Sequence, residues 1–248
     1  MRRDGETDSR LTAKIKKISK LVSGVLPEAD IEGVTHKRGM NRKTAHSYEK
    51  EFEGQYGQVR DVIILESTWF GYYEPYGSRT IHSFIYSMME KGGQLSLAKT
   101  LGLLPFEVNV LLPQRTLCEK IMSLVRFSYT KTPIEDLRSK IRHVYDLHQM
   151  LLQADLELFF NGPLFEEMLF NVAADDRISF RNNNEWLKYH PNDSLMFSDV
   201  DKVWADIRTV YNGTFRNLVF GGYVPDEAHI LGTLQKIRAR MEKITWVV

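Results

Sequence analysis

The sequence is short of the features that mark secreted and membrane proteins. It has one cysteine, Cys118, so no disulfide can form within the chain, which suits a reducing compartment. No apolar run approaches the roughly 18–20 residues needed to span a bilayer. The polar start, residues 1–10, has no apolar segment of the kind that a secretory signal requires. We therefore expect a cytoplasmic protein without a membrane partner.

Neither positive nor negative residues are in clear excess. The 33 Lys and Arg residues against 32 Asp and Glu give a net charge of +1, so no global field attracts nucleic acid. A basic stretch at residues 36–43 could contact RNA phosphates, but it contains no aromatic side chain for base stacking, and we favour a solvated loop there.

The chain is otherwise ordinary for a globular protein, with 43% hydrophobic and 26% charged residues in a length of 248. Apolar residues at helical spacing alternate along it with two short β-branched runs. The pattern predicts an α+β fold. Helices are expected at residues 11–26, 79–90, 114–127, 134–152, 155–172, 199–211 and 225–244; strands at 59–68, 106–112 and 218–220; and a loop or hairpin arm at 36–50.

The sequence offers few candidates for catalytic or metal-binding residues. Glu66 ends an apolar strand, where a carboxylate could project into a cleft, although an exposed glutamate is the commoner case. Glu107, on the next predicted strand, has the same two interpretations. The seven histidines are scattered without the spacing of a zinc site.

Two predicted helices carry charged pairs four residues apart, Arg115 with Glu119 and Arg142 with Asp146. Such pairs are most often exposed ion pairs worth a few tenths of a kcal/mol. The alternative is that both helices line one cleft and present these groups, with Lys120, to an anionic ligand. His143, three residues before Asp146, would then suit a base oriented by a carboxylate, although a histidine at the edge of the core is the commoner case.

These two helices resemble a known family. Arg115-Thr116-Leu-Cys-Glu119-Lys120, followed by Arg142-His143-Val-Tyr-Asp146-Leu, is similar to the late motifs of nucleotidyltransferases of the AbiEii/AbiGii toxin type. The apolar strand that ends at Glu66 resembles the family strand with the third metal-binding carboxylate. The resemblance covers residues 59–244 and is strongest at 113–152.

The resemblance implies a small mixed sheet with flanking helices: a partial nucleotidyltransferase-like portion at 1–112 and a helical portion at 113–248. It implies transfer of a nucleoside monophosphate from an NTP to an RNA or protein acceptor with Mg²⁺, and an antitoxin as partner. The implied catalytic residues are Glu66, also the metal ligand, Lys120 and Asp146. The implied nucleotide-binding residues are Arg115, Glu119, Lys120, Arg142 and His143; in one branch of the family an aspartate stands at the position of His143.

One family motif is missing from the sequence. A Gly-Gly or Gly-Ser turn leading to an Asp-x-Asp strand should precede the helix at residues 11–26, and only Asp4, Glu6 and Asp8 stand there. Without paired carboxylates the two-metal reaction has no obvious site. We therefore weigh an enzyme whose start is truncated against a degenerate, non-catalytic relative that binds nucleotide, RNA or an antitoxin. A third alternative is an α+β domain whose ion pairs only stabilise it.

Overall fold

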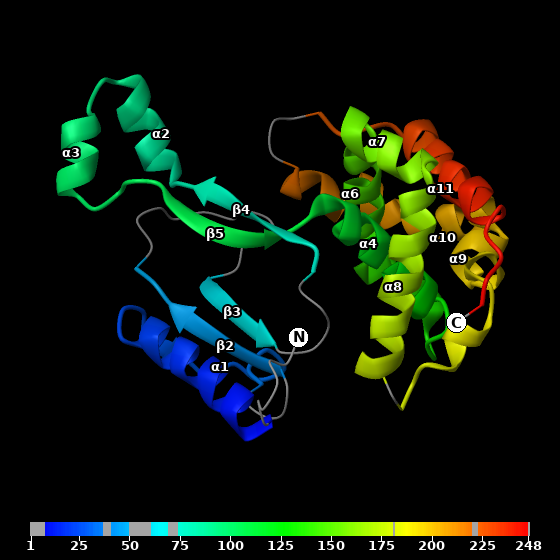
Figure 1. The fold of residues 1–248 in the computed structure, drawn as a ribbon, viewed down its shortest axis with the longest axis horizontal. Coiled ribbons are helices and arrows are strands. Elements are labelled where there is room, and N and C mark those ends of the chain that lie inside the picture. Colours follow the sequence, from blue (N-terminus) through cyan, green and yellow to red (C-terminus); the bar gives the residue numbers. More distant parts are fainter. Residues whose placement is uncertain are drawn as a thin grey trace.

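The computed structural model describes residues 8–36, 41–49, 61–68, 74–180, 182–219 and 223–247. It confirms the α+β class: strands and helices are mixed in the first portion, and in the described residues after it there are only helices (Figure 1). The first portion contains α1 (Asp8–Ser23), β1 (Glu28–Ala29), β2 (Asn41–Ser47), β3 (Val62–Thr68), β4 (Tyr76–Ile81), α2 (Phe84–Lys91), α3 (Leu95–Thr100) and β5 (Phe106–Leu111).

Strand β2 is the centre of the first sheet. It pairs antiparallel with β1 on one side and with β3 on the other. Thr44, Ala45 and His46 are fully buried, and His46 Nε2 lies 2.9 Å from the Thr44 hydroxyl. The polar composition of this segment suggested a loop or hairpin arm, but pairing on both edges makes it a strand. Lys37 and Arg38, in the predicted basic loop, lie outside the described residues.

Strand β3 was predicted correctly as a strand and wrongly as buried. It pairs with β2 from Val62 opposite Ser47 to Thr68 opposite Asn41, and its residues are half-buried or exposed. Ile63 is 47% exposed. The apolar run reflects β propensity here rather than a place in the core.

The second sheet is a hairpin of β4 and β5 with α2 and α3 inserted between its strands. The helix predicted at 79–90 is wrong at its start, because residues up to Ile81 pair with β5 and the helix begins after Ser83, whose hydroxyl accepts from the Tyr86 amide. Across the strands, Ser78 donates to Glu107 at 2.5 Å, and hydrogen bonds from Ser78 and Thr80 lower the Glu107 pKa. Glu107 is thus a cross-strand acceptor.

The second portion is a helical bundle. Two predicted helices are each split into two. Lys140 separates α5 from α6. Gly162 separates α7 from α8, because a residue that precedes a proline, here Pro163, is disfavoured in the helical conformation. Leu218, predicted in a short strand with Phe220, ends a 3-10 helix, and Phe220 lies outside the described residues. The bundle contains α4 (Pro113–Phe127), α5 (Pro133–Ser139), α6 (Ile141–Leu151), α7 (Ala154–Asn161), α8 (Pro163–Ser179), α9 (Leu195–Ser198), α10 (Val200–Asn212) and α11 (Glu227–Met241), with 3-10 helices at Glu185–Lys188, Pro191–Asp193 and Thr214–Leu218.

The main hydrophobic core lies in this bundle and extends from Leu117 on α4 to Ile244 after α11. α4 packs against α6 and α8, so its buried face holds it between them. In the part of the chain that the structure describes, no helix has the length and apolarity to cross a membrane.

Candidate functional site

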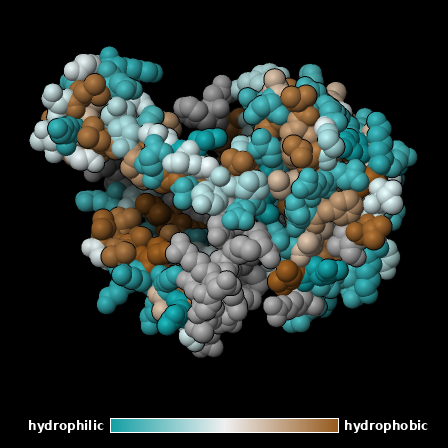
Figure 2. Space-filling model, in the orientation of Figure 1, coloured by the Kyte–Doolittle hydropathy of each residue, from teal (hydrophilic) through white to brown (hydrophobic). Residues whose placement is uncertain are grey.

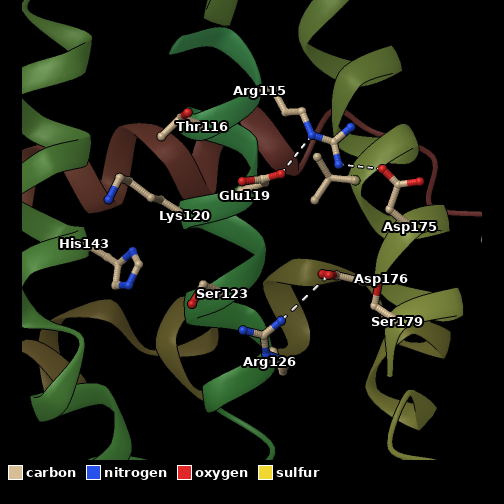
Figure 3. Close-up of a pocket in the computed structure, with 11 residues that line it drawn as sticks. Arg115, Thr116, Glu119, Lys120, Ser123, Arg126, His143, Asp175, Asp176 and Ser179 are labelled. Carbon is tan, nitrogen blue, oxygen red and sulfur yellow. Dashed lines mark hydrogen bonds and ion pairs between the residues drawn. The ribbon is translucent and has the colours of Figure 1, made fainter. Parts of the chain in front are cut away.

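A cleft of about 320 Å³ lies between helices α4, α6 and α8 (Figure 3). α4 runs through its centre, with His143 of α6 on one side and two aspartates of α8 on the other. Ligand pockets are typically about 300–1,000 Å³, so the cleft is large enough for a small molecule. It is lined by Arg115, Thr116, Glu119, Lys120, Ser123, Arg126, His143, Val172, Asp175, Asp176 and Ser179.

Lys120 is the cation that joins the two predicted motifs. Its Nζ lies 2.7 Å from Asp146 Oδ2, and the two side chains are 19% and 24% exposed. The structure therefore brings Lys120 of α4 and Asp146 of α6 together. Arg142 lies on the other side of Asp146 at 3.7 Å and is 78% exposed, so it points to solvent and does not line the cleft.

His143 lines the cleft beside Lys120 (Figure 3). Burial, followed by the charges of Lys120 and Lys140, lowers the His143 pKa to about 4, so the ring is neutral at pH 7. Its Nδ1 atom is buried and has no hydrogen-bond partner among the described residues. A buried polar atom left unpaired costs free energy. His143 is therefore a neutral hydrogen-bonding group that a ligand could satisfy.

Arg115 joins three segments of the chain. Its guanidinium donates to Glu119 at 2.8 Å, to the Glu74 carbonyl before β4 at 2.9 Å, and to Asp175 of α8 at 2.5 Å. The side chain is only 5% exposed. Three of its five N–H donors are thus engaged, so contact with a nucleotide, which the resemblance implies for Arg115 and Glu119, would use the remaining two or compete with these bonds.

Arg126 and Asp176 form a looser pair at the other end of the cleft. Arg126 Nη1 and Asp176 Oδ1 are 3.7 Å apart, beyond hydrogen-bond length, while the guanidinium stacks 4.2 Å from the centre of the Phe180 ring. Burial, opposed by Arg126, raises the Asp176 pKa to about 6. Both groups are partly desolvated and keep hydrogen-bonding capacity for a ligand.

The α8 side of the cleft was missed from the sequence. The sequence pattern predicts a helix that ends at residue 172 and does not single out Asp175 or Asp176, whereas α8 continues to Ser179. Adjacent aspartates at the end of an apolar helical pattern were the available signal. Arg126 was also missed, although it lies two turns beyond Glu119 and three turns beyond Arg115 on the same helix.

Glu66 lies apart from the residues that line the cleft. On β3 it is 57% exposed and its Oε2 is 3.9 Å from Lys43 Nζ, its cross-strand partner. Burial is the largest cause that lowers the Lys140 pKa. The charges of Glu66 and Lys43 also act on it, Glu66 by raising the pKa and Lys43 by lowering it. The first sheet thus reaches the start of α6, but Glu66 is not gathered with the cleft carboxylates.

A magnesium site does not assemble from the described residues. No group of three or more His, Cys, Asp or Glu side chains among them is arranged to hold a metal. Asp4 and Glu6, which precede the first helix, lie outside the described residues, and so does the side chain of Asp8. We therefore derive no step through a metal, and the roles of Glu66 as metal ligand and of Mg²⁺ as cofactor stay predictions.

Comparison with known proteins agrees with the motifs on α4 and α6. The family described as "Nucleotidyl transferase AbiEii toxin, Type IV TA system" matches residues 3–219, which spans both sheets, the cleft and most of the bundle. No curated protein and no solved structure matches the chain. Because the family match covers most of the sequence, this chain belongs to the AbiEii family of nucleotidyl transferase toxins of type IV toxin–antitoxin systems.

Proposed function

We propose that the protein transfers a nucleoside monophosphate from an NTP to an RNA or protein acceptor, with the NTP bound in the cleft between α4, α6 and α8. The observation that carries the proposal is the Lys120–Asp146 pair at 2.7 Å, which fixes an ammonium group at the cleft. An ammonium has three donors, and Asp146 occupies one of them. The others remain for phosphate oxygens, whose negative charge the cation stabilises.

The remaining polar groups of the cleft suit the rest of a nucleotide. Arg126 can donate to a ligand because its pairing with Asp176 is loose. Asp176 and Ser179 offer oxygens to the hydroxyl or amino groups of a nucleoside. His143, neutral at pH 7, adds a hydrogen-bonding nitrogen without adding charge.

The proposed transfer is a substitution at the α-phosphorus. A hydroxyl oxygen of the acceptor forms a bond to that phosphorus and gives its proton to water, while the bond to the leaving pyrophosphate breaks and the pyrophosphate departs with the electron pair of that bond. Lys120 would stabilise the charge on the phosphate oxygens, and Asp146 would hold Lys120 in place. Arg142 and Glu66 do not line the cleft, so the roles that the family resemblance implies for them, Arg142 at the phosphates and Glu66 as a carboxylate base or metal ligand, would require them to approach it in the substrate complex. The reaction is proposed to take place in the cytoplasm, with an antitoxin opposing it.

Calorimetry with ATP, CTP, GTP and UTP, with and without Mg²⁺, tests the binding step. We expect binding of at least one NTP, and a loss of about tenfold or more in Lys120→Ala, which corresponds to about 1.4 kcal/mol. Lys188→Ala is the matched control, since Lys188 forms an exposed ion pair with Glu185 outside the cleft. If no NTP binds the wild type, the proposal fails.

A transfer assay with labelled NTP then separates the enzyme from its alternative. Label that becomes attached to RNA or protein and is lost in both Lys120→Ala and Asp146→Asn supports transfer. Binding without any transfer would support the degenerate relative that only binds nucleotide, and would contradict the catalytic part of the proposal.

A further inference from the structure

The helical hairpin of α2 and α3 exposes large apolar side chains. Figure 1 shows the two helices projecting away from both sheets and from the bundle, and Figure 2 shows hydrophobic atoms on their surface. Phe84 is 88% exposed, Met88 73% and Ile85 58%. Solvated helices normally turn such residues inward.

These residues continue onto the adjoining strands. Phe84 and Met88 lie one turn apart on α2, with Ile85 beside them. Ile81, three residues before Phe84, pairs across the strands with Phe106, and the two are 40% and 58% exposed. We call this set the hairpin face: Ile81, Phe84, Ile85, Met88 and Phe106.

The hairpin's own core is too small to cover this face. Tyr86, Met89 and Ala98 are its buried residues, with Leu103 packed against them. These side chains join α2 to α3 and leave the hairpin face outside. A small core together with a large apolar exterior is typical of an element that packs against a partner.

The exposed area of the hairpin face fits a dimer interface. At about 200 Å² for each large apolar side chain, the exposed fractions leave roughly 600 Å² open to solvent. Stable interfaces bury about 600–1,000 Å² on each partner. We propose that the hairpin face binds the same face of a second copy of this chain, forming a symmetric dimer.

Charge favours a second copy as the occupant. The hairpin face contains no charged residue, and the charged residues of the two helices are Glu90, Lys91 and Lys99. A face without charge gives no attraction to an acidic or basic partner. In a twofold dimer it meets an apolar surface of equal size, and Glu90 of one copy can pair with a lysine of the other.

Light scattering coupled to size-exclusion chromatography tests the proposal on the full chain. We expect the wild type to have the mass of two chains of 28.8 kDa. Phe84→Asp combined with Met88→Asp should give a monomer. The matched control, Leu158→Asp with Leu164→Asp, changes residues that are 76% and 62% exposed on the bundle and should leave the dimer intact. A monomeric wild type at every concentration would overturn the proposal, even if another protein binds the face.

Cross-linking keeps the test independent of how the aspartate variants fold. The native Cys118 is fully buried, so a cysteine introduced on the surface is the reactive thiol. Ile85→Cys should be cross-linked as a dimer by bifunctional maleimides of several lengths, and Leu158→Cys should not. Equal cross-linking of both variants, or of neither, would contradict a dimer through the hairpin face.

Discussion

The bundle and the strand-bearing first portion differ in how much apolar surface each of them buries. One continuous hydrophobic core extends from α4 to the end of α11. In contrast, α2 and α3 share only a few buried side chains, and no residue of β3 is fully buried. The cleft residues come from α4, α6 and α8, the packed part. A site built on rigid helices holds its side chains in place more precisely than one built on partly exposed strands.

Core truncation should show the largest contrast between the two portions. Phe165→Ala removes a fully buried ring that packs 4.8 Å from Phe160, and we expect a loss of about 3–5 kcal/mol of unfolding free energy. Met89→Ala, in the small hairpin core, should cost about 2 kcal/mol, at the low end of the range for Met→Ala, since its neighbours can relax. Urea denaturation measures both. Equal losses would mean that the hairpin is packed as firmly as the bundle.

Removal of the Arg115 side chain should have the next largest effect. Arg115→Ala leaves Asp175, 13% exposed, without its cation, and we expect a loss of about 3 kcal/mol. Arg115→Lys, which keeps the charge but not three directed donors, should recover part of it. Thermal unfolding measures the change. A loss below about 1 kcal/mol would show that this contact is not structural.

Two cleft residues should give opposite pH dependences. The Asp176 pKa is raised to about 6, so in the folded state it binds a proton that the unfolded state releases, and its contribution falls as pH rises from about 4 to 6. The His143 pKa is lowered to about 4, so its contribution rises with pH from about 4 to 6.5. The two trends oppose each other in the wild type.

Single variants should expose each trend. Relative to wild type, Asp176→Asn should gain stability as pH rises from 4 to 6, and His143→Gln should lose it, each by on the order of 2 kcal/mol. Urea denaturation at several pH values measures the slopes. A double variant that keeps the pH profile of either single variant would show that other groups set the dependence.

Arg142→Ala should have the smallest effect on stability, within about 0.5 kcal/mol, because the Arg142 side chain is 78% exposed and lies 3.7 Å from Asp146. The NTP affinity of the Arg142→Ala variant shows whether Arg142 contacts the phosphates. A fall in affinity at unchanged stability would support the predicted role of Arg142. Unchanged affinity, measured by calorimetry, would leave Lys120 and Arg126 as the cations that act on the nucleotide.

The sequence predicted the α+β class and the family, because helical periodicity and motif order can be recognised in a single chain. A cleft shared by the helices of Lys120 and Asp146 was only the less common of two interpretations, since their approach depends on tertiary packing. For residues 36–50 the sequence offered only a loop or a hairpin arm, whereas β2 is the central strand of a sheet and its Thr44 and His46 are buried. The sequence also did not predict Asp175 and Asp176, since only tertiary packing places the end of α8 beside α4. Glu66 is a residue that the sequence singled out but the cleft does not include. Its place near the end of a strand suggested a carboxylate that projects into a cleft, whereas its side chain faces Lys43.

The three acceptors of Arg115 come from α4, from α8 and from the segment that leads into β4. The guanidinium has five N–H donors, three of which make these bonds, and an anion that replaces one of the three acceptors releases the segment that carries it. If a ligand replaces the Glu74 carbonyl, the segment that leads into β4 loses its contact with Arg115. Ligand binding at this end of the cleft would then change the orientation of β4 and of the hairpin that follows it.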